Sequence, residues 1–100
     1  MEDMFRNLIP AIILVLALLP AGPASAECYA DYKAKKDEPL RLHYGVIRIP
    51  DDLCSHSGAE THIRQRIQQA GWTLLIVNSL FGREGLEERR QNAGSFFLRF

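Results

Sequence analysis

The stretch from Ser57 to Phe81 decides the fold, and it reads SGAETHIRQRIQQAGWTLLIVNSLF. Its first four residues match a capping box, in which Ser57 accepts a hydrogen bond at the start of a helix and Glu60 bonds back to it. Apolar side chains then recur at helical spacing until Gly71, which supplies a left-handed C-terminal cap. The sequence therefore predicts an amphipathic helix with an apolar stripe of Ala59, Ile63, Ile67 and Ala70.

The second half of this stretch, residues 72–81, is apolar on both faces of an extended chain. Such a segment is typical of a central strand that is covered on both sides. Residues 40–49 form a second predicted strand, because they alternate with period two. The alternation slips near Ile49, which indicates a bulge or burial on both sides there. The apolar, buried side of this strand is expected to hold Leu40, Leu42, Tyr44 and Val46, and the polar side Arg41, His43 and Gly45.

Three other segments complete the predicted fold. Residues 27–36 contain good helix formers and opposite charges at i,i+4, so they predict a helix. Residues 84–91 predict one or two helical turns in a charged connection, and residues 95–100 predict a final strand that pairs antiparallel with residues 72–81. We therefore expect one α+β domain over residues 27–100, with a small sheet of about three strands packed against one or two helices.

A cleavable signal peptide is predicted over residues 1–26. The segment 8–19 is uncharged and almost wholly aliphatic, Pro20 and Pro23 end it, and the small-x-small pattern of residues 24–26 fits a signal peptidase. A helix of that segment would span about 18 Å, whereas the hydrocarbon of a bilayer is roughly 30 Å thick. The sequence therefore predicts export to the periplasm or the medium, with no stable membrane anchor after cleavage.

Alternatives to this leader remain open at the sequence level. Glu2 and Asp3 are acidic where such leaders are usually cationic, so translation from Met4 is one hypothesis. A short core helix of a cytosolic protein is a second. A lipoprotein is a third, because Cys28 lies two residues beyond the cleavage point, although Glu27 stands where a lipobox needs a small residue.

The two cysteines of the chain, Cys28 and Cys54, are predicted to form a disulfide, because pairing is the default in an oxidising compartment. Closing this loop would stabilise the fold by on the order of 3.5 kcal/mol. A core of 74 residues rarely supplies more than about 3–5 kcal/mol, so the bridge would matter. The alternative is a reactive or metal-binding site around Cys54 and His56, which lacks the four ligands of structural zinc.

Charge and residue chemistry exclude several classes of function. Residues 27–100 hold 11 Lys plus Arg and 10 Asp plus Glu, so no net charge favours nucleic acid. The histidines His43, His56 and His62 do not share a metal-binding spacing, and we expect them to be solvated. Ser57 is interpreted as a helix cap rather than a nucleophile. We therefore expect no enzyme, no cofactor and no metal site.

One region is a candidate for partner recognition. The connection 83–90 concentrates mixed charge between two apolar segments, and the helix that follows Ser57 presents arginines on its exposed side. A solubilising connection is the alternative interpretation. The possible contacts to an unknown protein or envelope component are Arg64, Arg66, Arg83, Arg89 and Arg90.

In the run QAGWTLLIV at residues 69–77, a helix meets a hydrophobic strand at a Gly-Trp junction. With this run and with residues 40–46 and 92–100, the chain resembles small exported bacterial proteins of unknown function. It implies no activity. We therefore expect a non-catalytic binding or accessory module. The alternatives are a binder of peptidoglycan or another envelope polymer, for which a sporulation-related cell-wall module is similar in size, and a small enzyme.

Overall fold

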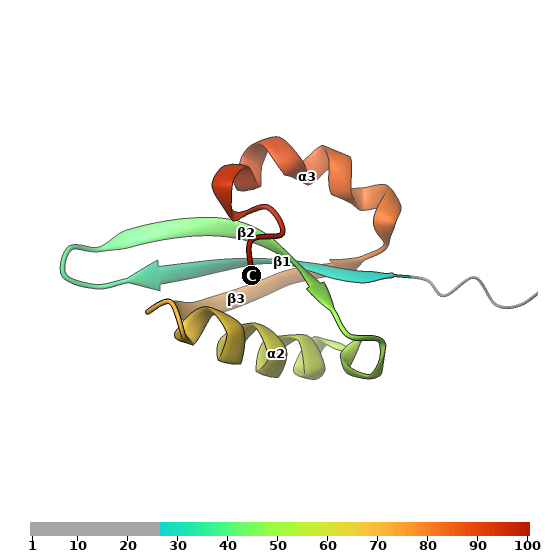
Figure 1. Cartoon of the computed structure of the whole chain (residues 1–100), viewed down its shortest axis with the longest axis horizontal. Coiled ribbons are helices and arrows are strands. Elements are labelled where there is room, and N and C mark those ends of the chain that lie inside the picture. Colours follow the sequence, from blue (N-terminus) through green and yellow to red (C-terminus); the bar gives the residue numbers. More distant parts are fainter. Residues whose placement is uncertain (1–26) are drawn as a thin grey trace, which may run out of the picture.

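The computed structural model describes residues 27–100, which form a three-stranded antiparallel sheet. The strands are β1 (Cys28–Lys36), β2 (Arg41–Ile49) and β3 (Thr73–Phe81). Their order is β2-β1-β3, so β1 pairs with both neighbours. Helix α2 (His56–Gln68) packs on one face of the sheet and helix α3 (Leu86–Ala93) on the other (Figure 1). The predicted α+β fold is confirmed, and the predicted signal peptide over residues 1–26 lies outside the described residues.

The prediction of a helix over residues 27–36 is wrong, because this segment is the central strand β1. Alternate residues of β1 are small or aromatic and point to the α2 side of the sheet, where Tyr32 and Ala34 are fully buried. Pairing with β2 on one side and β3 on the other satisfies the backbone of β1. Two neighbouring strands that are distant in sequence therefore override a weak local preference for helix.

Strand β3 is an edge strand, not the predicted centre of the sheet. Leu75 and Ile76 are 51% and 52% exposed, whereas Val77 is buried against α2. The register with β1 shifts twice along β3. Both β2 and β3 run antiparallel to β1, so the connection through α2 crosses the central strand to reach the other edge.

The sides of β2 are opposite to the prediction over its first half. His43 is 7% exposed and Gly45 is buried, while Leu42 is 66% exposed. The reason is the pairing of His43 with Ala34 and of Gly45 with Tyr32, which places them on the side that α2 and the C-terminal aromatic residues cover. The expectation that His43 is solvated is therefore wrong.

Helix α2 begins earlier than predicted. Ser55, not Ser57, is the N-cap, and its hydroxyl accepts a hydrogen bond from the amide of Gly58 at 3.0 Å. The predicted apolar stripe is buried at Ala59, Ile63 and Ile67, whereas Ala70 lies beyond the helix and is exposed. Gly71 adopts φ +84°, as predicted for a left-handed cap, and the Trp72 amide donates to the Ile67 carbonyl at 3.1 Å.

The prediction of a final strand over residues 95–100 is also wrong. A short 3-10 turn follows α3, and only an isolated parallel bridge joins Phe97 to Val46 at the outer edge of β2. The amide of Leu98 donates to the carbonyl of Val46 at 2.8 Å. The end of the chain therefore lies along the edge of β2 rather than beside β3 (Figure 1).

The predicted disulfide between Cys28 and Cys54 is confirmed, with the two Cα atoms 6.1 Å apart. It joins the start of the central strand to the segment before α2. On the α2 side the bridge packs into a core of Ala30, Tyr32, Ala34, Ile47, Ile49, Ala59, Ile63, Ile67, Trp72 and Val77. The core therefore lies between the sheet and α2, which leaves the β2 edge free to carry a surface site.

Candidate functional site

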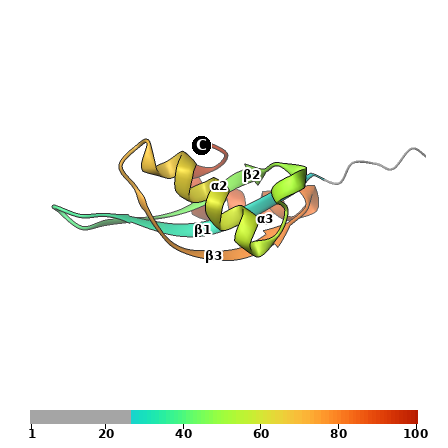
Figure 2. The ribbon, with the colours of Figure 1, turned by 90° about the horizontal axis from the view of Figure 1, so that it is seen from below.

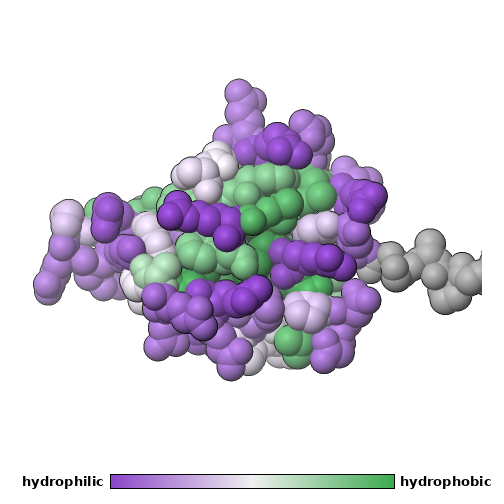
Figure 3. Space-filling model, in the orientation of Figure 1, coloured by the Kyte–Doolittle hydropathy of each residue, from purple (hydrophilic) through white to green (hydrophobic). Residues whose placement is uncertain are grey.

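A groove runs along the outer edge of β2, between α2 and the end of the chain. We call it the basic groove and define it by Tyr29, Arg48, Arg66, Leu98 and Phe100, which line a cavity of about 340 Å³. Hydrophobic residues on this side of the molecule are flanked by strongly hydrophilic ones (Figure 3). The groove thus combines apolar walls with two guanidinium groups.

A second hollow adjoins the basic groove and shares both arginines with it. It has about 300 Å³ and is lined by Arg48, Pro50, Asp51, His62 and Arg66. Arg48 and Arg66 therefore stand between two surface depressions, and a ligand larger than one anionic group could contact both. Asp51 supplies the single carboxylate in the lining of either cavity.

Strand β2 positions Arg48 one residue before its end. Arg48 pairs with Tyr29 across the sheet, so the two side chains lie on the same face. The C-terminal segment is hydrogen-bonded to the β2 edge at Val46, two residues earlier. The Arg48 side chain consequently stays exposed at the open end of the edge.

Helix α2 positions Arg66 together with His62. The two residues are four apart and share one flank of the helix, beside the buried stripe, while Arg64 lies on the opposite flank. The pKa of His62 is lowered, first by its partial burial and then by the positive charge of Arg66. This direction keeps His62 neutral, so the guanidinium groups are the permanent charges of the site.

The two groove arginines are unpaired within the described part of the chain. Neither Arg48 nor Arg66 forms an ion pair among residues 27–100. The neighbouring acid, Glu27, is already bound by the hydroxyl of Tyr29 and by Arg83, whose Nη2 lies 2.7 Å from a carboxylate oxygen. These hydrogen bonds, that of Arg83 first, lower the pKa of Glu27. The two arginines are therefore free to bind an external anion.

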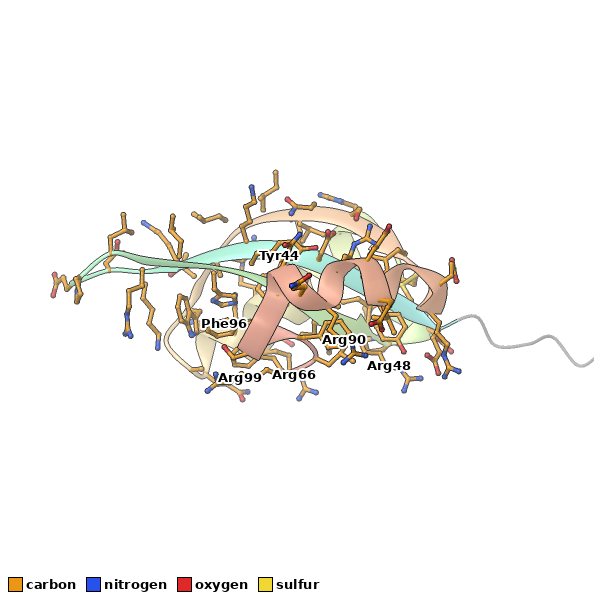
Figure 4. The ribbon with its side chains drawn as sticks, turned by 90° about the horizontal axis from the view of Figure 1, so that it is seen from above. Tyr44, Arg48, Arg66, Arg90, Phe96 and Arg99 are labelled. Carbon is orange, nitrogen blue, oxygen red and sulfur yellow. A yellow bond between two sulfur atoms is a disulfide. The ribbon has the colours of Figure 1, made fainter. Side chains whose placement is uncertain are left out.

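Two further arginines border the C-terminal segment. The guanidinium of Arg90 lies 4.4 Å from the ring centre of Phe97, and that of Arg99 lies 5.3 Å from the ring centre of Phe96. Figure 4 shows both arginines on the same side of the molecule as Arg48 and Arg66. The positive charge of the groove thus extends along the end of the chain.

The arginines predicted as partner contacts do not form one cluster. Arg66 reaches the basic groove, whereas Arg90 lies over the Phe97 ring and pairs with Glu87 at 3.2 Å. Arg64 points to solvent near Glu60, and Arg83 is held by Glu27. Arg48 and Arg99 were not predicted. In the sequence, each of them is only a cation within an alternating apolar segment. The long-range packing of β2, α2 and the chain end is what identifies the site.

Arg89 has a structural partner rather than an open position. Its Nε lies 3.1 Å from Asp31, a buried carboxylate that also accepts hydrogen bonds from Tyr44 at 2.7 Å and Ser79 at 2.6 Å. Burial alone would raise the pKa of Asp31, but these hydrogen bonds and the charge of Arg89 lower it overall. The cluster fixes α3 to the sheet, and both oxygens of its carboxylate accept hydrogen bonds from within the protein.

His43 lies at the centre of an aromatic cluster on the α2 side. Its Nε2 is 3.0 Å from the hydroxyl of Tyr32, and its ring stacks on Phe96 at 3.8 Å between centroids. The other ring nitrogen, Nδ1, is buried without a hydrogen-bond partner among the described residues. Burial, and then the charges of Arg99 and Lys36, lower the pKa of His43 to about 4.

No family model, curated protein or solved structure matches this chain. Among residues 27–100 there is no group of three or more histidine, cysteine or acidic side chains that could hold a metal ion. The same residues include no helix of sufficient length and apolar character to cross a membrane.

Proposed function

We propose that this protein is an exported, non-catalytic binding module that takes an anionic group of a partner protein into the basic groove. The observation that carries the proposal is the pair of unpaired guanidinium groups, Arg48 and Arg66, which come from different elements and line the same two cavities. The Cys28–Cys54 disulfide supports a location outside the cytoplasm, because such bonds persist in oxidising compartments.

The groove has the chemistry that a carboxylate or phosphate requires. Guanidinium groups present several donors in a planar fork that matches either anion, and hydrogen bonds to charged groups are stronger than neutral ones. Tyr29 and Phe100 form apolar walls beside the arginines. Such walls lower the local exposure to water and strengthen the attraction between opposite charges.

An anionic envelope polymer such as peptidoglycan is the second candidate. It is favoured by the two adjoining cavities that share Arg48 and Arg66, because a polymer presents several groups to a continuous surface. A catalytic role has less support. The buried titratable side chains Asp31 and His43 contact other protein groups and do not line the basic groove.

Capture from envelope extract tests the proposal. The immobilised protein is compared with the variant Arg48→Gln/Arg66→Gln and with Arg41→Gln/Arg64→Gln, a matched control that removes two arginines outside the groove. We expect the groove variant to lose its ligand at least tenfold, since each charged hydrogen bond is worth about 1.5–3 kcal/mol, and the control to keep it. Equal capture by all three proteins would contradict the proposal.

Sedimentation with purified peptidoglycan separates the two candidates. If the ligand is this polymer, the protein sediments with it, the groove variant stays in the supernatant, and added salt weakens the binding. A protein ligand would instead appear as a captured chain that the control retains. Sedimentation of the groove variant to the same extent as the unmodified protein would exclude the groove as the polymer site.

A further inference from the structure

A second exposed surface lies at the other end of the sheet, on the face that α3 covers only in part. Lys33 and Lys35 of β1 pair with residues of β2 and β3 that point to the same face, including Leu42 and Ile76. Leu75 joins them, because it lines a cavity of about 300 Å³ together with Lys33 and Leu42. We call these five residues the hairpin face.

The hairpin face is unusually apolar for a solvent-exposed surface. Leu42, Leu75 and Ile76 are all more than half exposed, and Leu40 in the adjoining turn is 65% exposed. Residues 27–100 include five exposed large hydrophobic side chains, and these are four of them. A concentration of exposed apolar side chains on one face indicates a binding surface, because single exposed residues are ordinarily scattered.

The shape of the molecule leaves this face accessible. The β1–β2 hairpin extends beyond both helices (Figures 1 and 2). Helix α3 is fixed over the opposite half of the sheet, where Arg89 binds Asp31 and its guanidinium lies 3.9 Å from the ring centre of Phe81. An extended surface can therefore approach the projecting half without contact with α3.

The charge of the face limits what can cover it. Lys33 forms no ion pair among residues 27–100, and Lys35 has a weak partner in Asp37 at 3.5 Å. A symmetric pair of copies would place the lysines of one face against those of the other, with no acidic residue on the face to compensate. The complementary occupant is therefore anionic as well as apolar.

We propose that the hairpin face binds reversibly to the anionic surface of a lipid bilayer. Aliphatic side chains enter the boundary between headgroups and acyl chains, and Lys33 and Lys35 extend to the lipid phosphates. A protein partner fits this composition less well, because protein interfaces are depleted in lysine and enriched in aromatic residues and arginine. The turn acids Asp37 and Glu38 reduce the attraction, so the binding is weak and depends on salt.

This proposal does not depend on the function of the basic groove, and vesicles test it directly. The protein, expressed as the full chain and purified after export with its disulfide intact, is sedimented with vesicles of equal phosphatidylglycerol and phosphatidylcholine, and with vesicles of phosphatidylcholine alone. Mass analysis establishes whether residues 1–26 are present. All variants are compared in the same processing state, so differences in vesicle binding between them are due to the substitutions.

Loss of the two lysines or of the two exposed aliphatic residues should weaken binding to the anionic vesicles. We expect about 30-fold from Lys33→Gln/Lys35→Gln and roughly tenfold or more from Leu42→Ser/Ile76→Ser. The control Arg64→Gln removes an exposed cation of α2 that lies outside both the hairpin face and the basic groove, and it should bind as before.

Three results would overturn the proposal. The first is equal binding to both kinds of vesicle. The second is loss of binding in Arg48→Gln/Arg66→Gln but not in the lysine variant, which would assign lipid binding to the basic groove. The third is a dimer in sedimentation equilibrium that Leu42→Ser/Ile76→Ser converts to a monomer, since the hairpin face would then bind a second copy of the chain.

Discussion

Protonation of His43 should destabilise the fold at mildly acidic pH. The folded protein holds the pKa of His43 at about 4, against the ordinary value of 6.5. Between pH 6.5 and about 4, His43 therefore binds a proton in the unfolded chain but stays neutral in the folded protein. The stabilisation from neutral His43 is complete above pH 6.5 and is lost as the pH falls through this window toward 4.

The magnitude follows from the size of the shift. One pKa unit corresponds to about 1.4 kcal/mol, so the free energy of unfolding should fall by about 3 kcal/mol between pH 6.5 and 4. A loss of that size is a large part of the stability of a small domain. His43 is 7% exposed, so solvent screens this effect little.

The assay is urea unfolding followed by circular dichroism from about pH 7.5 to about pH 4.5, with the disulfide intact. The variant His43→Phe keeps an aromatic ring beside Phe96 but cannot take up the proton, so its stability should change much less over this range. The control Tyr32→Phe removes the hydrogen bond to His43, which costs about 1 kcal/mol, and keeps the slope.

The assay ends at about pH 4.5, no lower than the ordinary pKa values of Asp31 and Glu27, and the folded protein lowers the pKa of each. Their contribution is present above the ordinary carboxylate pKa and is lost at more acidic pH. If His43→Phe loses stability with falling pH as steeply as the unmodified protein does, the assignment of the slope to His43 is refuted.

Two further predictions concern the core. Replacement of both cysteines, Cys28→Ser/Cys54→Ser, should lower the free energy of unfolding by on the order of 3.5 kcal/mol, and urea unfolding of the reduced protein should give a similar loss. Gly45→Ala should cost about 1–3 kcal/mol, because a Cβ there would lie 2.6 Å from the buried Tyr32 ring. The control Gly82→Ala meets only the carboxylate end of the exposed Glu84, which can move, and a thermal melt should show little change.

The sequence predicts the elements that are defined locally and fails where distant segments decide. The helix that ends at Gly71 is recognisable from the spacing of its apolar residues and from its caps. The Cys28–Cys54 bridge is recognisable because the chain holds only these two cysteines. Residues 27–36 carry both a helical charge pair and a strand-like alternation that buries Tyr32. Only the presence of a partner strand on each side decides between them.

Strands β2 and β3 show a second limit of sequence analysis. An aliphatic run such as residues 73–81 predicts burial on both faces, yet β3 lies at an edge and leaves Ile76 exposed. In β2 the burial of His43 depends on aromatic residues from the far end of the chain, including Phe96. No local pattern contains that information, so the exposed and buried sides of β2 were interchanged.

The candidate site was predictable in part. Arg66 is recognisable as an exposed cation on an amphipathic helix. Its pairing with Arg48 depends on where the β2 edge meets α2 and the chain end, and that arrangement follows from the tertiary fold. Arg89 differs from Arg66, because it forms an ion pair with the buried carboxylate of Asp31 in β1, a partner that the sequence does not reveal.

The most direct test of the basic groove is a titration with inorganic phosphate at constant ionic strength, followed by the NMR signals of the arginine Nε–H groups. The signals of Arg48 and Arg66 should shift saturably, while those of Arg41 and Arg64 should not. Equal shifts at all four arginines, or no shift at Arg48 and Arg66, would contradict the claim that this groove binds anions.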